Sequence, residues 1–222
     1  MFILKSLNKF GEYILLMGKV FSIPDRWSEF FRRYIMEVYQ LVIDSIAIVV
    51  TISLFIGAVI AIQTSLNIMS PLIPPYTVGL ITRDTLLLEF SSSIMCLILA
   101  GKIGSNIASE IGTMRVTEQI DALDIMGVNS ANYLILPALV TFIPILVAFS
   151  MFTGLFGGYL VSIFTSIIPT SRYVYGLQSY FNEYYIWYSI IKSLFFGFVI
   201  SSVASFYGYK VKGGALEVGQ AS

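Results

Sequence analysis

The sequence predicts an all-α, polytopic membrane protein. Hydrophobic residues make up 57% of its 222 residues and charged residues 12%, whereas a typical soluble domain carries about 25% charged residues. Between the sparse charges recur apolar stretches that are long enough to cross a hydrocarbon core about 30 Å thick. The predicted architecture is an interfacial amphipathic head at residues 1–40, followed by a bundle at residues 41–222 with four transmembrane helices.

Apolar runs and helix breakers define the four predicted spans, at residues 41–63, 85–107, 134–163 and 184–207. The third run is too long for one straight crossing and too short for two crossings with a turn. Pro137 and Pro144 are expected to kink it or to begin a helix. One kinked span and a re-entrant pair both remain compatible with this pattern. Its glycines at 154, 157 and 158 are expected to let a neighbouring helix approach closely.

The distribution of Lys and Arg predicts the orientation of the bundle. The head, the segment 101–133 and the tail together hold ten of these residues, whereas the other two connections hold only Arg83 and Arg172. Basic residues are retained on the cytoplasmic side of a membrane. The N-terminus, the segment 101–133 and the tail are therefore expected in the cytoplasm, and five tyrosines between Tyr173 and Tyr185 are expected near the opposite boundary.

The head alternates aromatic or aliphatic residues with Lys and Arg at helical spacing. Such a helix lies in the membrane interface with its basic side toward anionic headgroups. The alternative is a helix that packs on a soluble partner. Basic residues recur throughout the head and no small-residue cleavage site follows a short apolar core, which argues against a signal peptide.

Composition excludes several classes of function. The chain has no histidine and one cysteine, Cys96, which excludes disulfide frameworks, Cys/His zinc sites and imidazole catalysis. Its net charge of zero gives no basis for a nucleic-acid-binding surface. Gly101-Lys102 does not complete a phosphate loop, because Ile103 stands where that motif requires Ser or Thr. We therefore expect no cofactor and no nucleotide site on this chain.

Two charges lie inside the predicted spans, Glu89 in the second and Lys192 in the fourth. Both are several residues from the non-cytoplasmic end of their span, so they are expected at comparable depth. Because an isolated charge in lipid is costly, opposite charges at one depth indicate a pair or a shared polar cavity. The pair either lines a path for a charged or zwitterionic substrate or only fixes the register of two helices.

The cytoplasmic segment between the second and third spans contains a predicted short helix, Met114 to Met126, with Gly127 placed to cap its C-terminus. An apolar stripe runs along one side of this helix, and acidic residues gather on another. The stripe consists of Val116, Ile120 and Leu123; the acidic residues are Glu118, Asp121 and Asp124, with Arg115 near the start. This pattern indicates a surface that a soluble partner binds, the alternative being a solvated connecting helix.

The stretch from Ala100 to Asn129 (AGKIGSNIASEIGTMRVTEQIDALDIMGVN) closely resembles the signature of the MlaE-type (YrbE-like) permeases. These are membrane subunits of ABC systems that move phospholipids between bacterial inner and outer membranes. Leu54 to Gln63 is similar to the family's first helix, and Lys210 to Gly219 is similar to its last cytoplasmic loop. The similarity extends over nearly the whole chain.

This resemblance implies an inner-membrane permease that forms a homodimer, with a phospholipid cavity between the two copies. A cytoplasmic ABC ATPase dimer, which carries ATP and Mg²⁺, would bind the helix 114–126 of each copy. A periplasmic ring of MCE-domain protein and a STAS-domain protein are the further implied partners. The implied lipid-pathway residues are Glu89, Lys192 and Gln63. The implied ATPase-coupling residues are Arg115, Glu118, Gln119, Asp121 and Asp124.

The chain departs from the family pattern at two places. The family commonly has Arg-Glu-Leu-Gly-Pro around Glu89, whereas this chain reads Leu-Glu-Phe-Ser-Ser from Leu88, so Lys192 is expected to matter more as the charge partner. The family also continues past residues 210–219 into a fifth span, which this sequence lacks. A truncated, non-transporting anchor of such a complex is therefore the alternative function, followed by an ion-coupled secondary carrier.

Overall fold

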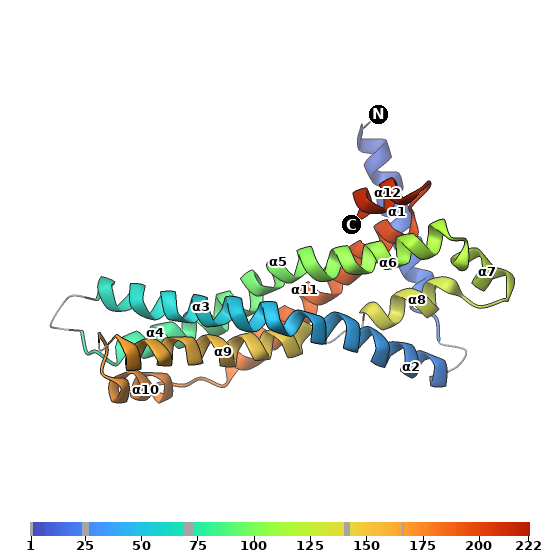
Figure 1. Cartoon of the computed structure of the whole chain (residues 1–222). Helices are drawn as coiled ribbons and strands as arrows, with labels where there is room; N and C mark the ends of the chain where they lie inside the picture. The colour runs from blue at the N-terminus through green and yellow to red at the C-terminus, as the bar shows by residue number, and fades with distance from the viewer. Residues whose placement is uncertain (1, 24–26, 69–72, 140–142, 166) are drawn as a thin grey trace. The chain divides into compact units, whose positions relative to one another are not determined.

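The computed structural model describes residues 2–23, 27–68, 73–139, 143–165 and 167–222. Every regular element in these ranges is a helix, which confirms the all-α prediction (Figure 1). The chain divides into two compact units, each formed by segments that are distant in sequence. Unit 1 comprises residues 1–42, 99–141 and 197–222, and unit 2 comprises residues 43–98 and 142–196.

Four helical runs are long and apolar enough to cross a membrane, and each contains one predicted span: Trp27–Asn67, Thr77–Val116, Ser130–Phe164 and Tyr184–Tyr209. The polytopic prediction is therefore confirmed. The first run joins α2 (Trp27–Val38), the π-helix η1 (Tyr39–Ile43) and α3 (Asp44–Asn67). The second run joins α4 (Thr77–Thr85), the π-helix η2 (Leu86–Ile94), α5 (Met95–Leu99), the π-helix η3 (Ala100–Gly104) and α6 (Ser105–Val116).

The third run consists of two helices, α8 (Ser130–Leu139) and α9 (Ile143–Phe164). Pro137 lies inside α8 and Pro144 lies at the beginning of α9; the residues between the two helices, where a kink was expected, lie outside the described residues. The 22 residues of α9 give it a length of about 33 Å at a rise of 1.5 Å per residue. Because this length crosses a membrane by itself, α9 favours a single crossing over a re-entrant pair.

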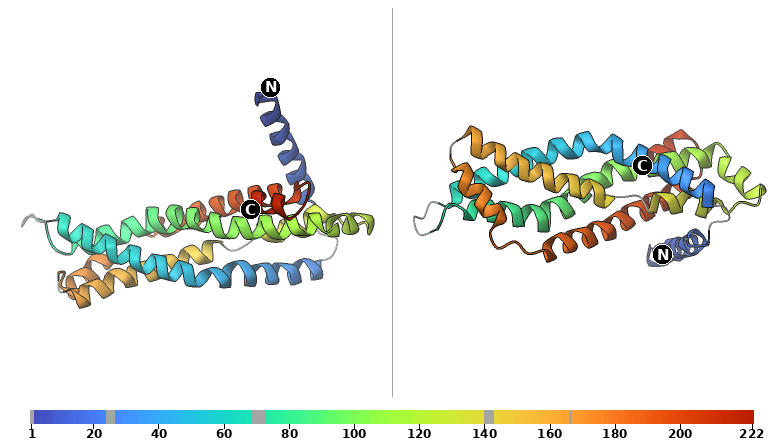
Figure 2. Two further views of the ribbon diagram at one scale, coloured as in Figure 1. Left: turned by 45° about the horizontal axis from the view of Figure 1, so that its top comes forward. Right: turned by 90° about the horizontal axis from the view of Figure 1, so that it is seen from below.

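Close contact between α3 and α9 forms the centre of unit 2, where the two helices run side by side (Figure 2). A Cβ atom added at Gly57 would meet the backbone of Gly154, and one added at Gly157 would meet the backbone of Leu54. Only glycine permits helix backbones to approach this closely. The expected role of Gly154 and Gly157 in close packing agrees with this geometry.

A buried tyrosine joins α10 (Thr170–Gln178) to the rest of unit 2. Tyr173 is fully buried with Ala61, Val78 and Ile168, and burial raises the pKa of its phenol. Its hydroxyl occupies the space that a Cβ at Gly158 would need. Tyr173 is therefore a core residue of unit 2, and its expected position near a membrane boundary stays a prediction.

Hydroxyl groups connect three helical segments inside unit 2. The Oγ atoms of Ser53 on α3 and Ser150 on α9 lie 2.9 Å apart, and Ser150 donates to Ser91 on η2 at 3.3 Å. All three serines are buried. Small side chains that hydrogen-bond between helices permit close packing and also satisfy polar atoms that water does not reach.

In unit 1, two asparagines hold the end of the N-terminal helix α1 (Phe2–Val20). The Nδ2 atom of Asn132 on α8 donates to the carbonyl oxygens of Val20 at 2.7 Å and Ser22 at 2.6 Å. Asn129 donates to the carbonyl oxygen of Lys19 at 3.0 Å. The last carbonyl groups of a helix have no partner inside the helix, so these amides supply one.

The helix α11 (Tyr184–Tyr209) provides further contacts to α1 within unit 1. Tyr13 donates to the hydroxyl of Ser202 at 2.9 Å, and Lys210, directly after α11, pairs with Glu12 at 3.0 Å. The predicted head is thus two separate helices, α1 and α2, and α1 packs on α8 through its C-terminal half.

Asn132→Ala is expected to loosen α1. The variant leaves two carbonyl oxygens without their donor, which costs about 1–3 kcal/mol for buried groups. Hydrogen exchange of the α1 amides should therefore become faster than in the parent protein. Asn182→Ala is the matched control, because Asn182 lies in unit 2 and its exposed side chain accepts a bond from the nearby backbone N–H of Tyr184. Equal rates of hydrogen exchange for the α1 amides in both variants would contradict the stabilising role of Asn132.

Gly57→Ala is expected to destabilise unit 2, because its methyl group would overlap the backbone of Gly154. Overpacking of this kind costs about 1–3 kcal/mol. Gly101→Ala is the control, since nothing lies within 4 Å of a Cβ added there, and Ala is favoured over Gly inside a helix by roughly 0.5–1 kcal/mol. Thermal unfolding in detergent should show a lower melting temperature for the first variant only.

Candidate functional site

Glu89 on η2 and Lys192 on α11 form an ion pair inside unit 2. The Nζ atom of Lys192 lies 3.2 Å from Oε2 of Glu89 and donates to the carbonyl oxygen of Leu88 at 3.1 Å. The Tyr188 ring lies beneath the ammonium, with its centroid 5.4 Å away. The structure thus brings together the two charges that the sequence placed at one depth.

The two partners differ in exposure. The side chain of Lys192 is 19% exposed and that of Glu89 is 63% exposed. Oε2 of Glu89 accepts from both Lys192 and Ser93, while its other oxygen has no hydrogen-bond partner among the described residues. Among the described residues, the carboxylate therefore keeps one acceptor oxygen at the surface of the unit.

The backbone around Glu89 is π-helical over nine residues, Leu86–Ile94. π-Helical turns inside α-helices are rare and occur frequently at functional sites. The carbonyl oxygen of Leu88 accepts from Ser92 and also from Lys192. Local backbone geometry and the charge pair thus meet at the same turn.

Gln63, the third predicted lipid-pathway residue, lies apart from this pair. It is exposed on α3, four residues before the end of that helix. No hydrogen bond among the described residues joins it to Glu89 or Lys192. The role of all three side chains in a lipid pathway remains a prediction.

The predicted coupling helix Met114–Met126 is divided in the structure, so its N-terminal part is wrong. Residues 114–116 are the last turn of α6, and a separate helix, α7, runs from Gln119 to Ile125. Between them Glu118 has a left-handed backbone with φ 60°, a conformation that costs an ordinary residue about 1–2 kcal/mol. Gly127 has φ 77° and follows α7 as the predicted C-cap.

An ion pair bridges the break at Glu118. Nη1 of Arg115, on α6, lies 2.6 Å from Oδ1 of Asp121, on α7. Ile120 is fully buried and anchors α7, which accords with the predicted apolar stripe. The remaining predicted coupling residues, Glu118, Gln119 and Asp124, are exposed. The acidic side of this segment therefore faces away from the interior of unit 1.

Two apolar residues beside the acidic side were missed by sequence reasoning. Ile125 is 87% exposed and Met126 is 67% exposed. Both lie outside the apolar stripe that contains Ile120 and directly before Gly127. Apolar residues at such positions are the sequence signal that would have identified them. We refer to Glu118, Gln119, Asp121, Asp124, Ile125 and Met126 as the α7 surface.

A three-charge cluster in unit 1 was also not identified from sequence. Nη2 of Arg33 lies 3.2 Å from Oε1 of Glu37 and 3.4 Å from Oε1 of Glu110. The ring of Tyr133 lies against the guanidinium, with its centroid 5.3 Å away. The cluster joins α2, α6 and α8, and the spacing of four residues between Arg33 and Glu37 was its local signal.

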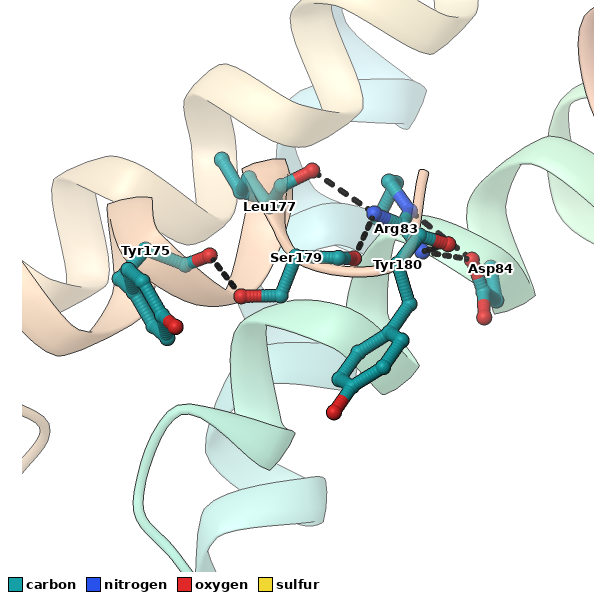
Figure 3. Close-up of polar contacts among 6 residues, drawn as sticks. All are labelled: Arg83, Asp84, Tyr175, Leu177, Ser179 and Tyr180. Atoms are coloured by element: carbon teal, nitrogen blue, oxygen red, sulfur yellow. Dashed lines mark hydrogen bonds and ion pairs between the residues drawn. The ribbon is translucent and has the colours of Figure 1, made fainter. Parts of the chain in front are cut away.

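Arg83 holds the loop between α10 and α11 (Figure 3). The guanidinium is buried and donates to the carbonyl oxygens of Leu177 at 2.8 Å, Ser179 at 2.7 Å and Tyr180 at 3.4 Å. Its remaining donors contact Oδ1 of Asp84, at 2.9 Å from Nε and 2.8 Å from Nη2. In the sequence, Arg83 contributed only to the prediction of membrane orientation. In the structure it is a clamp that holds this loop.

Comparison with known proteins places these features in a family. The family described as Permease MlaE matches residues 34–222. A probable ABC transporter permease protein of Rickettsia bellii is 32% identical over 221 residues, which is 98% of this chain and 84% of that protein. A probable ABC transporter permease protein of Synechocystis is 31% identical, over 81% of this chain and 69% of that protein.

A further relative has a more specific name. The intermembrane phospholipid transport system permease protein MlaE of Haemophilus influenzae is 27% identical over 209 residues, 92% of this chain and 78% of that protein. The family match covers the spans, the Glu89–Lys192 pair and the α7 surface. This chain is a multi-pass membrane protein that belongs to the MlaE permease family of ABC transporter permeases.

Proposed function

We propose that this permease moves phospholipids between the inner and outer membranes, driven by a separate cytoplasmic ATPase. One observation carries the choice of substrate: an ammonium and a carboxylate lie 3.2 Å apart among apolar helices, and the carboxylate is largely exposed. A molecule with long apolar chains and a charged headgroup suits that combination. The likeness to the Haemophilus influenzae phospholipid permease supports the same choice.

The charge pair complements a zwitterionic headgroup. Lys192 has three N–H donors, of which two are engaged by Glu89 and Leu88. Its third donor is available to a phosphate oxygen, and the free oxygen of Glu89 is available to a headgroup ammonium. Because such contacts form in a poorly hydrated environment, they are stronger than in water. The proposed role of Gln63 is a secondary polar contact at the end of the pathway.

The α7 surface is the proposed contact for the ATPase. Its acidic residues offer charge complementarity to a basic groove, and Ile125 and Met126 offer an apolar anchor of the kind that dominates interface energetics. The Arg115–Asp121 bridge would transmit movement of α7 to α6. ATP and Mg²⁺ would be bound by the partner, and this chain would contribute the lipid path.

The proposed assembly is a permease homodimer with an ATPase dimer on its cytoplasmic side. A ring of MCE-domain protein on the periplasmic side and a STAS-domain protein on the ATPase complete it. The excess of Lys and Arg in the head, the segment 101–133 and the tail supports an inner-membrane orientation with a cytoplasmic N-terminus.

Exchange of the two charges, Glu89→Lys with Lys192→Glu, separates transport from structural pairing. If the pair only fixes helix register, the exchanged protein should recover both the melting temperature and the lipid movement that the single substitutions lose. If the pair aligns a headgroup, the exchange should restore stability but leave lipid movement near that of Lys192→Met. The measurement is ATP-dependent phospholipid transfer by the reconstituted complex, with Lys192→Arg as the variant that keeps the cation. Restored phospholipid transfer in the exchanged protein would contradict the proposal that Glu89 and Lys192 contact the headgroup.

Ile125→Glu is expected to weaken binding of the ATPase on the order of tenfold, which corresponds to about 1.4 kcal/mol. The substitution introduces a charge that must be desolvated at the centre of the α7 surface. Leu216→Glu is the matched control, because Leu216 on α12 (Ala215–Ala221) is 86% exposed and lies outside that surface. Copurification of the ATPase should fall for the first variant only, and equal recovery would contradict the assignment.

A further inference from the structure

We propose that a cavity in unit 2 binds one hydrocarbon chain of a membrane lipid. The cavity has a volume of about 300 Å³ and lies among α9, η2 and the beginning of α11. Met151 and Leu155 of α9, Leu87 of η2, Phe181 and Ile190 contribute to its lining. Every one of these side chains is apolar, so the cavity is built to take hydrocarbon.

Arg83 is the charged residue of the lining, and it offers no donor to a ligand. All of its N–H groups are directed to the carbonyl oxygens of Leu177, Ser179 and Tyr180 and to Asp84. A water molecule in a cavity needs two to four polar partners, which this lining does not present. The clamp therefore shapes one wall while leaving the interior apolar.

The surroundings identify the source of the hydrocarbon. The lining residue Phe152 is 74% exposed, and it lies in a run that is long and apolar enough to cross a membrane, so a hydrocarbon chain of the bilayer has access to the cavity. An empty apolar void forfeits dispersion contacts on one side of its lining. The volume is at the lower end of the range for small-molecule sites, about 300–1,000 Å³, which suits a single acyl chain rather than a whole two-chain lipid.

This site is separate from the Glu89–Lys192 pair. Leu87 and Ile190 line the cavity, whereas Glu89 and Lys192, each two residues further along the same helical segments, do not. Residues two apart point to different sides of a helix. The proposal therefore concerns a resident lipid chain, and it holds or fails independently of the proposed transport.

The test uses the whole chain in nanodiscs that contain phosphatidylcholine with a photoreactive diazirine on its acyl chain. Residue-level mass spectrometry should find the label at Met151 and Leu155. Ala148→Trp fills the cavity and is expected to lower labelling of Leu155 on the order of tenfold. Phe149→Trp is the matched control, since Phe149 is the next residue of α9, is exposed and does not line the cavity. Labelling of Leu155 in this variant should equal that in the parent protein.

A second variant keeps the proposal falsifiable if Ala148→Trp fails to fold. Met151→Ala enlarges the cavity and should raise labelling of Leu155 relative to Phe55, an exposed residue of α3 outside the site. Labelling of Leu155 that does not respond to either variant would overturn the proposal. So would a cross-link from the cavity to another protein segment in place of lipid.

Discussion

A charged side chain among apolar helices is costly unless it finds partners within the protein, and this constraint shapes unit 2. Arg83 meets it with three main-chain carbonyl groups and Asp84, which fixes the loop that precedes α11. Lys192, further along α11, has Glu89 and the carbonyl oxygen of Leu88 as its partners. The same helix is thus held at its beginning and in its interior. The close packing of α3 and α9, which is made without side chains at Gly57 and Gly154, forms the centre of the same unit.

The hydrogen-bond partners of Arg83 and Glu89 are unequal in number, and this difference supports the proposed role of Glu89 in substrate contact. Arg83 has every donor engaged and acts structurally, although it carries a full charge. Glu89 keeps one oxygen without a partner among the described residues and is largely exposed. An incompletely satisfied carboxylate in an apolar setting is costly unless a ligand or second chain completes its contacts. The residue with the unmet requirement, and not the most buried one, is therefore the better candidate for substrate contact.

The features that could be predicted from sequence are those that follow from composition and local period. Apolar runs predicted the four spans, and matching depth in two of those spans predicted that Glu89 and Lys192 lie together. The Arg83 clamp had no such signal, because it bonds main-chain carbonyl groups of residues that lie 94 to 97 positions away. The burial of Tyr173 had no such signal either, because its hydroxyl lies in space left by Gly158 on another helix. Long-range backbone contacts leave no periodic trace in a single sequence.

The break at Glu118 shows how a strained residue shapes the surface proposed to bind the ATPase. The apolar stripe of Val116, Ile120 and Leu123 fits one continuous helix, so local pattern alone favours the undivided form. The left-handed turn instead separates α7 from α6, while burial of Ile120 and the Arg115–Asp121 pair hold the two pieces together. Strain of this kind persists only where surrounding contacts outweigh it. A short helix held by a buried side chain, an ion pair and a bond from the Ser130 backbone to Asp124 can shift as a unit, whereas a continuous α6 would have to bend.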